Sequence, residues 1–486
     1  MTEPSSPAHL GIGRRETVVL AIAAVLTVAI RVLFPTVTPT VSADEGTWPL
    51  GVKLWTDTGQ LTPNFFTTPF YHLTVGIPFA LFGSTLFVAR TVSAVLGLLN
   101  LYLTYRIAER LFGDRRTAIG AALLLGTCYP GVLVDRKAFI EPIQISWMLG
   151  LVLFYLSTGR RALLGVVGCT AGLLLTKANA VFMLPVLGLT SILDWRRSPL
   201  GDWRHLAALA GGVVVAAGGY GIAYLVDPQT FLAGWSQKLM LGATRGPDGP
   251  GSDVAAAVEP ARRQALISLG RFRVNPYVWD AKLRQLTASE PFLLVGGALA
   301  AVKAWWSRPA RVLMLWLAGG LLFFFLQGQL DNHLAVLYPM MAVGTAWVLF
   351  DGPKEVWRSA AAAMIFVLGA GRSTGNLVVS KEPTRPAIRW LTARATADEV
   401  VLAAPRVLMM LPSKPASMFS LGDDFVPSCS GVRAVGARWI VFDDREWMSY
   451  LRRAGVEVQS VVDSLAPCAA QVYQDRVVRI LEVTNR

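Results

Sequence analysis

Hydrophobic runs of membrane-spanning length recur along this chain of 486 residues and are separated by short polar loops. A helix needs about 20 mostly apolar residues to cross the hydrocarbon core of a bilayer. The pattern predicts a polytopic α-helical membrane protein. The expected spans, about eleven in number, lie at residues 16–34, 86–109, 117–134, 139–158, 161–176, 178–194, 205–226, 290–306, 310–328, 333–350 and 357–373.

Charges in the loops predict the orientation of these spans. Arg14 and Arg15 precede the first span, and further arginine pairs fall in alternate loops, at 115–116, 160–161 and 196–197. Loops on the cytoplasmic side carry an excess of Lys and Arg. We therefore expect a multi-pass protein of the plasma (inner) membrane, with a cytoplasmic N-terminus and an extracytoplasmic C-terminus.

One apolar run, Phe70 to Phe82, is too short to cross a bilayer and contains His72, Gly76 and Pro78. If it crossed, every later arginine pair would face outward. We interpret it as a Pro-interrupted amphipathic helix that lies on the outer leaflet. It closes one long outer loop, 35–85.

The last part of the chain is polar and predicts a small α/β domain outside the membrane, at 376–486, following a transmembrane domain at 1–375. Hydrophobic alternation and period predict strands at 399–404, 438–442, 456–462 and 476–483, and helices at 386–395 and 445–454.

Composition agrees with a membrane protein. Hydrophobic residues make up 53% of the chain and charged residues 16%, whereas soluble domains carry about 25% charged residues. The net charge of +13 comes from basic residues in short loops, where they set topology. The expected partner is therefore the lipid bilayer, and no nucleic-acid partner is expected.

Two of the four cysteines are expected to form a disulfide. Cys429 and Cys468 flank the strand–helix–strand unit of the C-terminal domain, which the topology places in an oxidising compartment. The alternative is two unpaired small residues. Cys128 and Cys169 lie in apolar runs and are expected to be packing residues.

An acidic pair, Asp44 and Glu45, follows the first span and is expected at the outer face of the membrane. A carboxylate there can take the proton of an attacking hydroxyl group, or hold a divalent cation beside a phosphate. The alternative is an ordinary solvated or helix-capping pair.

Basic residues also occur at the outer ends of spans, where the positive-inside rule depletes them. Charges at membrane depth are costly and usually functional, and an anionic phosphate is their natural ligand. The alternative is that they snorkel, or pair with Asp135 and Glu141. The four residues are Arg90, Arg136, Lys137 and Lys177.

A short outer turn, 327–339, holds Asp331, His333 and Tyr338. His333 with Asp331 could bind a metal or a sugar, although a lone histidine at a helix start is also commonly a structural polar residue. The chain has no His and Cys spacing typical of a zinc site.

The order of these motifs resembles the GT-C class of membrane glycosyltransferases, similar to the protein O-mannosyltransferases and the aminoarabinose transferases of lipid A. The resemblance covers about residues 16–200. It is carried by the acidic pair, the sequence Thr67 to His72, the ending Phe82–Gly83, and Val88–Ala89–Arg90 followed by Ser93. Segments 110–116, 135–142 and 174–177 are similar to further signatures. Thr-Pro-Phe at 68–70 and Glu141–Pro142 depart from the usual Pro-Pro-Leu and Asp-Pro.

The resemblance implies an enzyme that moves a sugar from a polyprenyl-phosphate donor to a protein, lipid or glycan acceptor at the outer face, by inverting displacement. Asp44 and Glu45 would be catalytic, and the four cations would bind the donor phosphate. A divalent metal (Mg, Mn or Zn) would be held by Glu45, Glu141 and His333. The residues expected to bind substrate are Tyr71, His72, Asp135, Glu141, His333 and Tyr338.

Two rival functions stay open at this stage. A lipid-linked polysaccharide ligase or polymerase would use a pyrophosphate-linked donor with similar outer cations. A secondary transporter usually shows paired repeats and broken spans at the midplane. Here the charged residues lie at one face, and a polar domain follows the last span.

Overall fold

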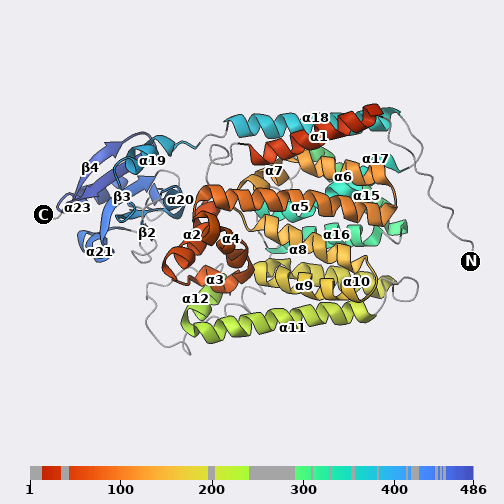
Figure 1. The fold of residues 1–486 in the computed structure, drawn as a ribbon, viewed down its shortest axis with the longest axis horizontal. Coiled ribbons are helices and arrows are strands. Elements are labelled where there is room, and N and C mark those ends of the chain that lie inside the picture. Colours follow the sequence, from red (N-terminus) through yellow and green to blue (C-terminus); the bar gives the residue numbers. More distant parts are fainter. Residues whose placement is uncertain are drawn as a thin grey trace, which may run out of the picture.

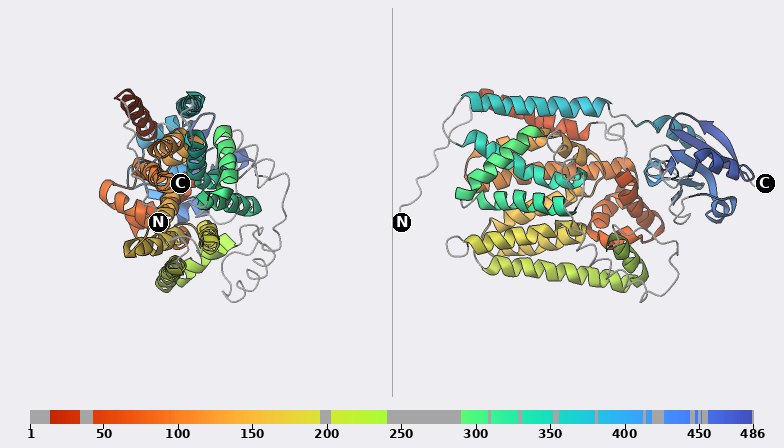
Figure 2. Two further views of the ribbon diagram at one scale, coloured as in Figure 1. Left: turned by 90° about the vertical axis from the view of Figure 1, so that its right-hand side faces the viewer. Right: turned by 180° about the vertical axis from the view of Figure 1, so that it is seen from behind.

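A computed structural model of the chain shows a helical body with a smaller sheet-containing domain at one end (Figure 1). The same arrangement is visible from behind (Figure 2). The structure describes residues 14–33, 43–194, 203–239, 290–307, 310–327, 331–351, 356–379, 382–411, 414–417, 426–443, 447–448, 451 and 456–484.

A helix occupies each run that was predicted to span the membrane. Two of the described helices, α5 and α11, are long and apolar enough to cross a bilayer alone, and the bent pair α6–α7 makes a third. The exact number of spans stays a prediction. The helices are α1 (Arg14–Val32), α5 (Leu86–Phe112), α6 (Arg115–Thr127), α7 (Tyr129–Arg136), α8 (Glu141–Tyr155), α9 (Arg160–Thr176), α10 (Met183–Asp194), α11 (Trp203–Val226), α15 (Pro291–Trp306), α16 (Arg311–Gln327), α17 (Tyr338–Phe350) and α18 (Val356–Val379).

Several of these helices are interrupted where the sequence predicts a continuous span. The α6–α7 pair bends by 65° at Cys128, where Pro130 in the first turn of α7 stops the α6 ladder. Short 3₁₀ segments, η1 (Ala178–Phe182) and η4 (Asp331–Leu337), precede α10 and α17. The breaks before α10 and α17 lie in or next to the motif segments 174–177 and 327–339.

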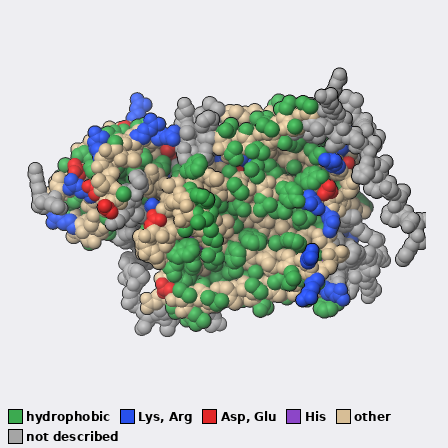
Figure 3. Space-filling view, in the orientation of Figure 1, with side chains coloured by type: hydrophobic (Ala, Val, Ile, Leu, Met, Phe, Trp, Pro, Cys, Tyr) green, Lys and Arg blue, Asp and Glu red, His purple; other side chains and the backbone are tan. Residues whose placement is uncertain are grey.

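The helical body exposes apolar side chains over its flanks, as expected for a surface that meets lipid. Val214 is 70% exposed and Leu225 is 78% exposed. Figure 3 shows these green side chains across the body, and Lys and Arg gathered at the end far from the C-terminal domain. That end holds the turn between α5 and α6, with Arg110 and Arg115, and the start of α9 at Arg160. The chain is a helical membrane protein.

The predicted outer loop 35–85 is mostly helical from residue 43 onward. Asp44 and Glu45 lie in the first turn of α2 (Ala43–Thr58), which is followed by α3 (Pro63–Thr67) and α4 (Pro69–Phe82). Helix α2 was not predicted, because Gly46, Pro49 and Gly51 are poor helix formers. Tertiary packing maintains this helix.

The short helix α4 differs from the prediction in two ways. It runs through Pro78 without interruption, and it is apolar on both faces. Tyr71 and Phe79 are buried, whereas Ile77 is 60% exposed and Phe82 is 74% exposed. A helix with an apolar exposed face belongs within lipid or at its border, so "amphipathic" was the wrong description.

The C-terminal domain contains a mixed sheet of five described strands in the order β2–β1–β3–β5–β4. β1 pairs in parallel with β2 and β3, and β5 pairs antiparallel with β3 and β4. The strands are β1 (Val400–Ala403), β2 (Lys414–Ser417), β3 (Ala437–Asp443), β4 (Ala469–Gln474) and β5 (Val478–Val483). The helices are α19 (Arg385–Thr392), α20 (Pro405–Leu408), α21 (Cys429–Ala434) and α23 (Val458–Leu465).

One predicted strand of this domain is wrong. Residues 456–462 lead into α23, because Val458, Val461 and Leu465 recur at helical spacing and the latter two are buried. The helix predicted at 445–454 falls largely outside the described residues. Cys429 and Cys468 form a disulfide, with an S–S distance of 2.08 Å and a Cα–Cα distance of 5.8 Å. The bridge ties α21 to the start of β4.

The C-terminal domain packs directly on α2. One hydrophobic cluster contains Leu50 and Val52 of α2, Tyr71 of α4, and Val407 and Leu408 of α20. At Gly46, a Cβ atom would lie 2.2 Å from the Arg406 backbone nitrogen. Glycine is required there because the two backbones touch. The acidic pair therefore lies one residue from the contact between the two domains.

Candidate active site

The two residues of the acidic pair differ in what the structure describes. The Glu45 side chain is buried, and the Asp44 side chain is not among the described ones. Glu45 is fully buried, and its two carboxylate oxygens accept from Arg90 Nε at 2.8 Å and Nη2 at 3.0 Å. Arg90, on α5, is also fully buried. This bidentate ion pair ties the first turn of α2 to α5. Asp44 lies beside Glu45 in α2, and its side chain is outside the described part of the structure.

The turn between α7 and α8 is held from two sides at Ala138. Its backbone N–H donates to Glu45 Oε1 at 2.9 Å, and its carbonyl accepts from the Tyr71 hydroxyl at 3.2 Å. α2 and α4 thus fix the position of the same residue. Burial raises the pKa of Tyr71 well above its usual value, and the nearby carboxylates of Glu45 and Glu141 raise it further. Tyr71 therefore remains a hydroxyl donor at physiological pH.

A second ion pair joins the end of α9 to the start of α8. Lys177 Nζ, at the end of α9, lies 2.6 Å from Glu141 Oε1, at the start of α8. The Glu141 side chain is 4% exposed and that of Lys177 is 12% exposed. Lys177 therefore keeps a small opening to its surroundings, while Glu141 is enclosed.

The remaining two predicted phosphate ligands differ in access. Arg136 is 2% exposed and donates to the Ile30 carbonyl at 2.5 Å. Lys137 ends α7, is partly exposed, and lies with Nζ 5.2 Å from the Phe139 ring centroid. Of the four predicted cations, the two lysines are accessible in this structure and the two arginines are not.

Asp135 is paired inside the helical body. Its carboxylate accepts from Arg31 Nε at 2.8 Å, and Arg31 also donates to the Gly126 carbonyl at 2.5 Å. A Cβ at Gly97 would lie 2.4 Å from the Asp135 carboxyl carbon, so α5 approaches closely here. This pair joins α1 to α7 beside α5, and the role of Asp135 in substrate binding stays a prediction. Arg31 was missed; its charge inside a predicted span was the available signal.

The other predicted substrate residues are placed as follows. His72 is fully buried, and its Nδ1 lies 3.1 Å from the Thr68 carbonyl, within α4. Tyr338 begins α17 and is 3% exposed. The backbone of His333 belongs to η4, and the His333 side chain is not among those that the structure describes. η4 contacts α7 and α8, so this turn does reach the candidate site.

A polar contact that sequence reasoning missed supports α8. Asn100 Nδ2 donates to the Pro142 carbonyl at 3.1 Å, and Asn100 Oδ1 accepts from the Ser146 hydroxyl at 2.7 Å. Asn100 is 3% exposed. The only sequence signal was an amide inside an apolar span, which commonly bonds across helices.

The described carboxylates fit ion pairs better than a metal. Among the described side chains, no three His, Cys, Asp or Glu residues lie close enough to hold a metal ion. Glu45 and Glu141 face Arg90 and Lys177 instead. The predicted metal set thus has two members engaged with cations, while His333 is undetermined.

The chain is similar to known membrane glycosyltransferases in both sequence and fold. The family model for dolichyl-phosphate-mannose-protein mannosyltransferases matches residues 67–218. An undecaprenyl phosphate-alpha-4-amino-4-deoxy-L-arabinose arabinosyl transferase from Pseudomonas aeruginosa is 36% identical over 148 residues, which cover 28% of this chain and 26% of that protein. The match thus spans about a quarter of the relative.

Solved structures of low identity share the whole fold. ArnT from Cupriavidus metallidurans, bound to undecaprenyl phosphate, aligns with a TM-score of 0.63 at 14% identity, covering 97% of this chain and 99% of that one. The oligosaccharyltransferase of Archaeoglobus fulgidus, in a complex with Zn and sulfate, aligns at 0.53 and 14% identity, covering 94% and 72%. The resemblance to GT-C membrane glycosyltransferases is confirmed by these findings.

Proposed function

From this fold and these relatives, we propose that the chain is a membrane glycosyltransferase that takes its sugar from a polyprenyl-phosphate donor. The observation that carries the proposal is the site at the end of the helical body that adjoins the C-terminal domain. There Glu45, Arg90, Lys177 and Glu141 form two ion pairs around the α7–α8 turn. Charged side chains buried at membrane depth are energetically costly, and those that are present usually serve a function.

The acidic pair has two roles in this proposal. Glu45 is the anchor: both of its oxygens accept from Arg90, and one also accepts from the Ala138 N–H. Asp44 is the general base. The anchor fixes the first turn of α2 and thereby the backbone that carries Asp44.

Lys177 and Lys137 are the proposed ligands of the donor phosphate. They are the accessible members of the predicted cation set, and they lie at the ends of α9 and α7. An ammonium group can bind phosphate as a point charge and stabilise the negative charge that develops on a leaving phosphate. Glu141 keeps Lys177 pointed at this position until the donor arrives.

The proposed reaction is one displacement at the anomeric carbon. The acceptor hydroxyl loses its proton to Asp44 as its oxygen bonds to that carbon. The bond between the carbon and the phosphate oxygen breaks, and the polyprenyl phosphate leaves with both electrons of that bond. The configuration inverts. None of these steps is assigned to a metal, because the described carboxylates already hold cations.

The proposed orientation places the site, the C-terminal domain and the C-terminus on the extracytoplasmic side of the plasma membrane. The arginines at the opposite end of the helical body support it (Figure 3). The acceptor is a protein, lipid or glycan on that side.

Incubation of the purified full-length protein with three labelled substrates tests the function. A radiolabelled polyprenyl-monophosphate sugar should lose its label to acceptor or water. A pyrophosphate-linked donor should be inert. Consumption of the pyrophosphate donor alone would indicate the ligase or polymerase alternative, and uptake of free sugar into vesicles without donor cleavage would indicate a transporter.

A further inference from the structure

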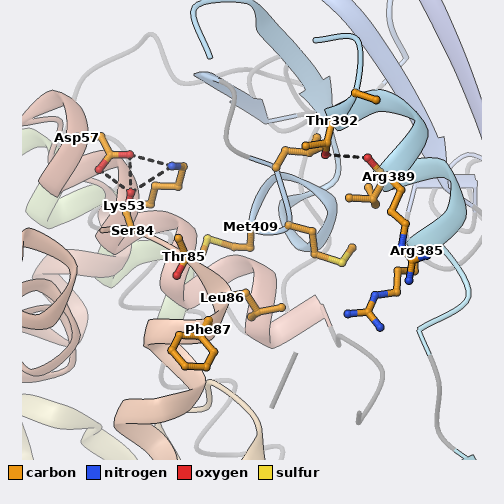
Figure 4. A pocket seen from close by; sticks show the side chains of 14 residues that line it. Lys53, Asp57, Ser84, Thr85, Leu86, Phe87, Arg385, Arg389, Thr392 and Met409 are labelled. Atoms are coloured by element: carbon orange, nitrogen blue, oxygen red, sulfur yellow. Dashed lines mark hydrogen bonds and ion pairs between the residues drawn. The ribbon is translucent and has the colours of Figure 1, made fainter. Parts of the chain in front are cut away.

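A pocket of about 870 Å³ lies between the helical body and the C-terminal domain (Figure 4). One wall is built from the end of α2 and the start of α5, with Lys53, Ser84 and Leu86. The other wall belongs to α19 and the segment after α20, with Arg389 and Met409. The proposed reaction does not use this pocket.

The α2 wall of the pocket lies beyond the acidic pair along that helix. Lys53 and Asp57 follow Asp44 by 9 and 13 residues in the same helix. At 1.5 Å per residue this is about 14–20 Å. A group bound against Lys53 and Asp57 would therefore lie at a different position from the acidic pair.

The two walls differ in whether their charged side chains are paired with other described residues. On the α2 side, Lys53 Nζ is 2.9 Å from Asp57 Oδ2, and the Ser84 hydroxyl donates to the same carboxylate at 2.8 Å. On the α19 side, Arg385 and Arg389 make no ion pair or side-chain hydrogen bond with any residue that the structure describes. Figure 4 shows Arg385 extending from α19 toward Leu86. The pocket thus offers two guanidinium groups to an anion.

The floor and border of the pocket are apolar and adjoin the lipid-facing surface. Leu86 and Met409 are buried within it, and Phe87 is 53% exposed. Just before the pocket, Leu81 is 69% exposed and Phe82 is 74% exposed, at the end of α4. An anion site beside exposed apolar side chains suits a molecule that has a charged head and an apolar tail.

We propose that this pocket binds the phosphate headgroup of an anionic phospholipid from the outer leaflet, with Arg385 and Arg389 as its ligands. The bound lipid fills the space between α19 and the start of α5. It thereby holds the C-terminal domain against the membrane body and against α2. The site is independent of the sugar donor, and it would exist even if the transferred group were different.

Native mass spectrometry of the full-length protein in detergent tests the site. The probe is phosphatidylglycerol, compared with phosphatidylcholine. Wild-type protein should bind phosphatidylglycerol preferentially, and the double variant R385Q/R389Q should bind it roughly tenfold or more weakly, since charge-assisted contacts to phosphate are lost. The matched control R394Q/R476Q removes two arginines of the same domain that do not line the pocket, and should bind like wild type.

Three results would overturn the proposal: equal binding of phosphatidylglycerol by wild type and R385Q/R389Q, equal binding of both lipids by wild type, or displacement by inorganic phosphate at the lipid's concentration. The last would indicate a site for a free anion. Neither guanidinium makes a described ion pair, so in detergent without added lipid the thermal unfolding temperature of the double variant should match that of wild type, whereas added phosphatidylglycerol should raise only that of wild type. If that variant fails to fold, the single variant R389Q should still bind phosphatidylglycerol more weakly than R394Q does.

Discussion

At the scale of single residues, the candidate site is organised by buried ion pairs. Arg90 with Glu45, Lys177 with Glu141, and Arg31 with Asp135 each join two helices that are distant in sequence. A buried pair is weak evidence for stability by itself, but removing one partner leaves an uncompensated charge. Substitution of one partner of a buried pair should therefore change the stability of the fold as well as the activity.

Glu45→Gln should lower the stability of the folded protein. It leaves the fully buried Arg90 without its carboxylate, and breaking a buried pair costs about 3–5 kcal/mol. The unfolding temperature in detergent should fall. The double variant Glu45→Gln with Arg90→Met should recover much of that loss, since the charge is then removed. A single variant with wild-type stability would show that the pair does not fix α2.

Lys177→Ala and Lys137→Ala should each weaken donor binding. One charge-assisted contact to phosphate contributes about 1.5–3 kcal/mol, which is roughly ten- to a hundredfold in affinity. Measuring donor affinity by titration checks this. Lys303→Ala is a control, since that lysine lies in the last turn of α15 and pairs with Asp351, which is not among the predicted site residues. Unchanged affinity in both site variants would assign the lysines to topology instead.

At the scale of elements, the account depends on α2, the helix that carries the acidic pair. Its first turn touches α20 of the C-terminal domain, with Gly46 against the Arg406 backbone. Arg406 is itself buried and paired with Asp443 of β3. The sheet domain thus supports the helix that carries the acidic pair.

Gly46→Ala should therefore lower the turnover number while leaving donor affinity nearly unchanged. The new Cβ would lie 2.2 Å from a backbone atom, so α2 or α20 must move. Gly168→Ala in α9 is the matched control, because nothing lies within 4 Å of its Cβ. Steady-state kinetics with both variants checks this. Equal turnover in the two would remove the supporting role of the C-terminal domain.

The elements also show how far the sequence can lead. Hydrophobic run length located a helix at every expected span, because lipid-facing helices must be apolar. It missed α2, whose glycines and proline are explained only by contacts with α4 and α20. Residues 456–462 were assigned to a strand, although Val458, Val461 and Leu465 have helical spacing. Motif order singled out Glu45, Arg90, Glu141 and Lys177, which form two ion pairs in the structure, but it could not show that Arg90 and Arg136 are enclosed.

At the scale of the whole molecule, the proposed orientation sets both faces of the protein. A reporter that is active only outside the membrane, fused after Arg486, should be active, whereas one fused after Arg116 should be inactive. The alternating arginine loops are the physical reason. The reverse pattern at either site would contradict the orientation.

The disulfide provides an independent check of the same orientation. In an oxidising compartment the Cys429–Cys468 bridge should persist, and it closes a loop of 39 residues. Such a bridge stabilises by roughly 3–4 kcal/mol in the chain-entropy model. Cys429→Ser should lower the unfolding temperature of the C-terminal domain, whereas Cys169→Ser, of a free buried thiol, should not remove any bridge. Free alkylation of both thiols in native protein would place the domain in the cytosol.

The central claim is that Asp44, held in place by the Glu45 anchor, removes the proton of an acceptor at a lipid-phosphate sugar. The most direct measurement is single-turnover release of labelled sugar from polyprenyl phosphate by wild type and by Asp44→Asn. The account predicts unchanged donor affinity and a rate lower by about 10²–10⁴-fold, because general-base catalysis contributes that much. A variant that releases sugar at the wild-type rate would contradict it.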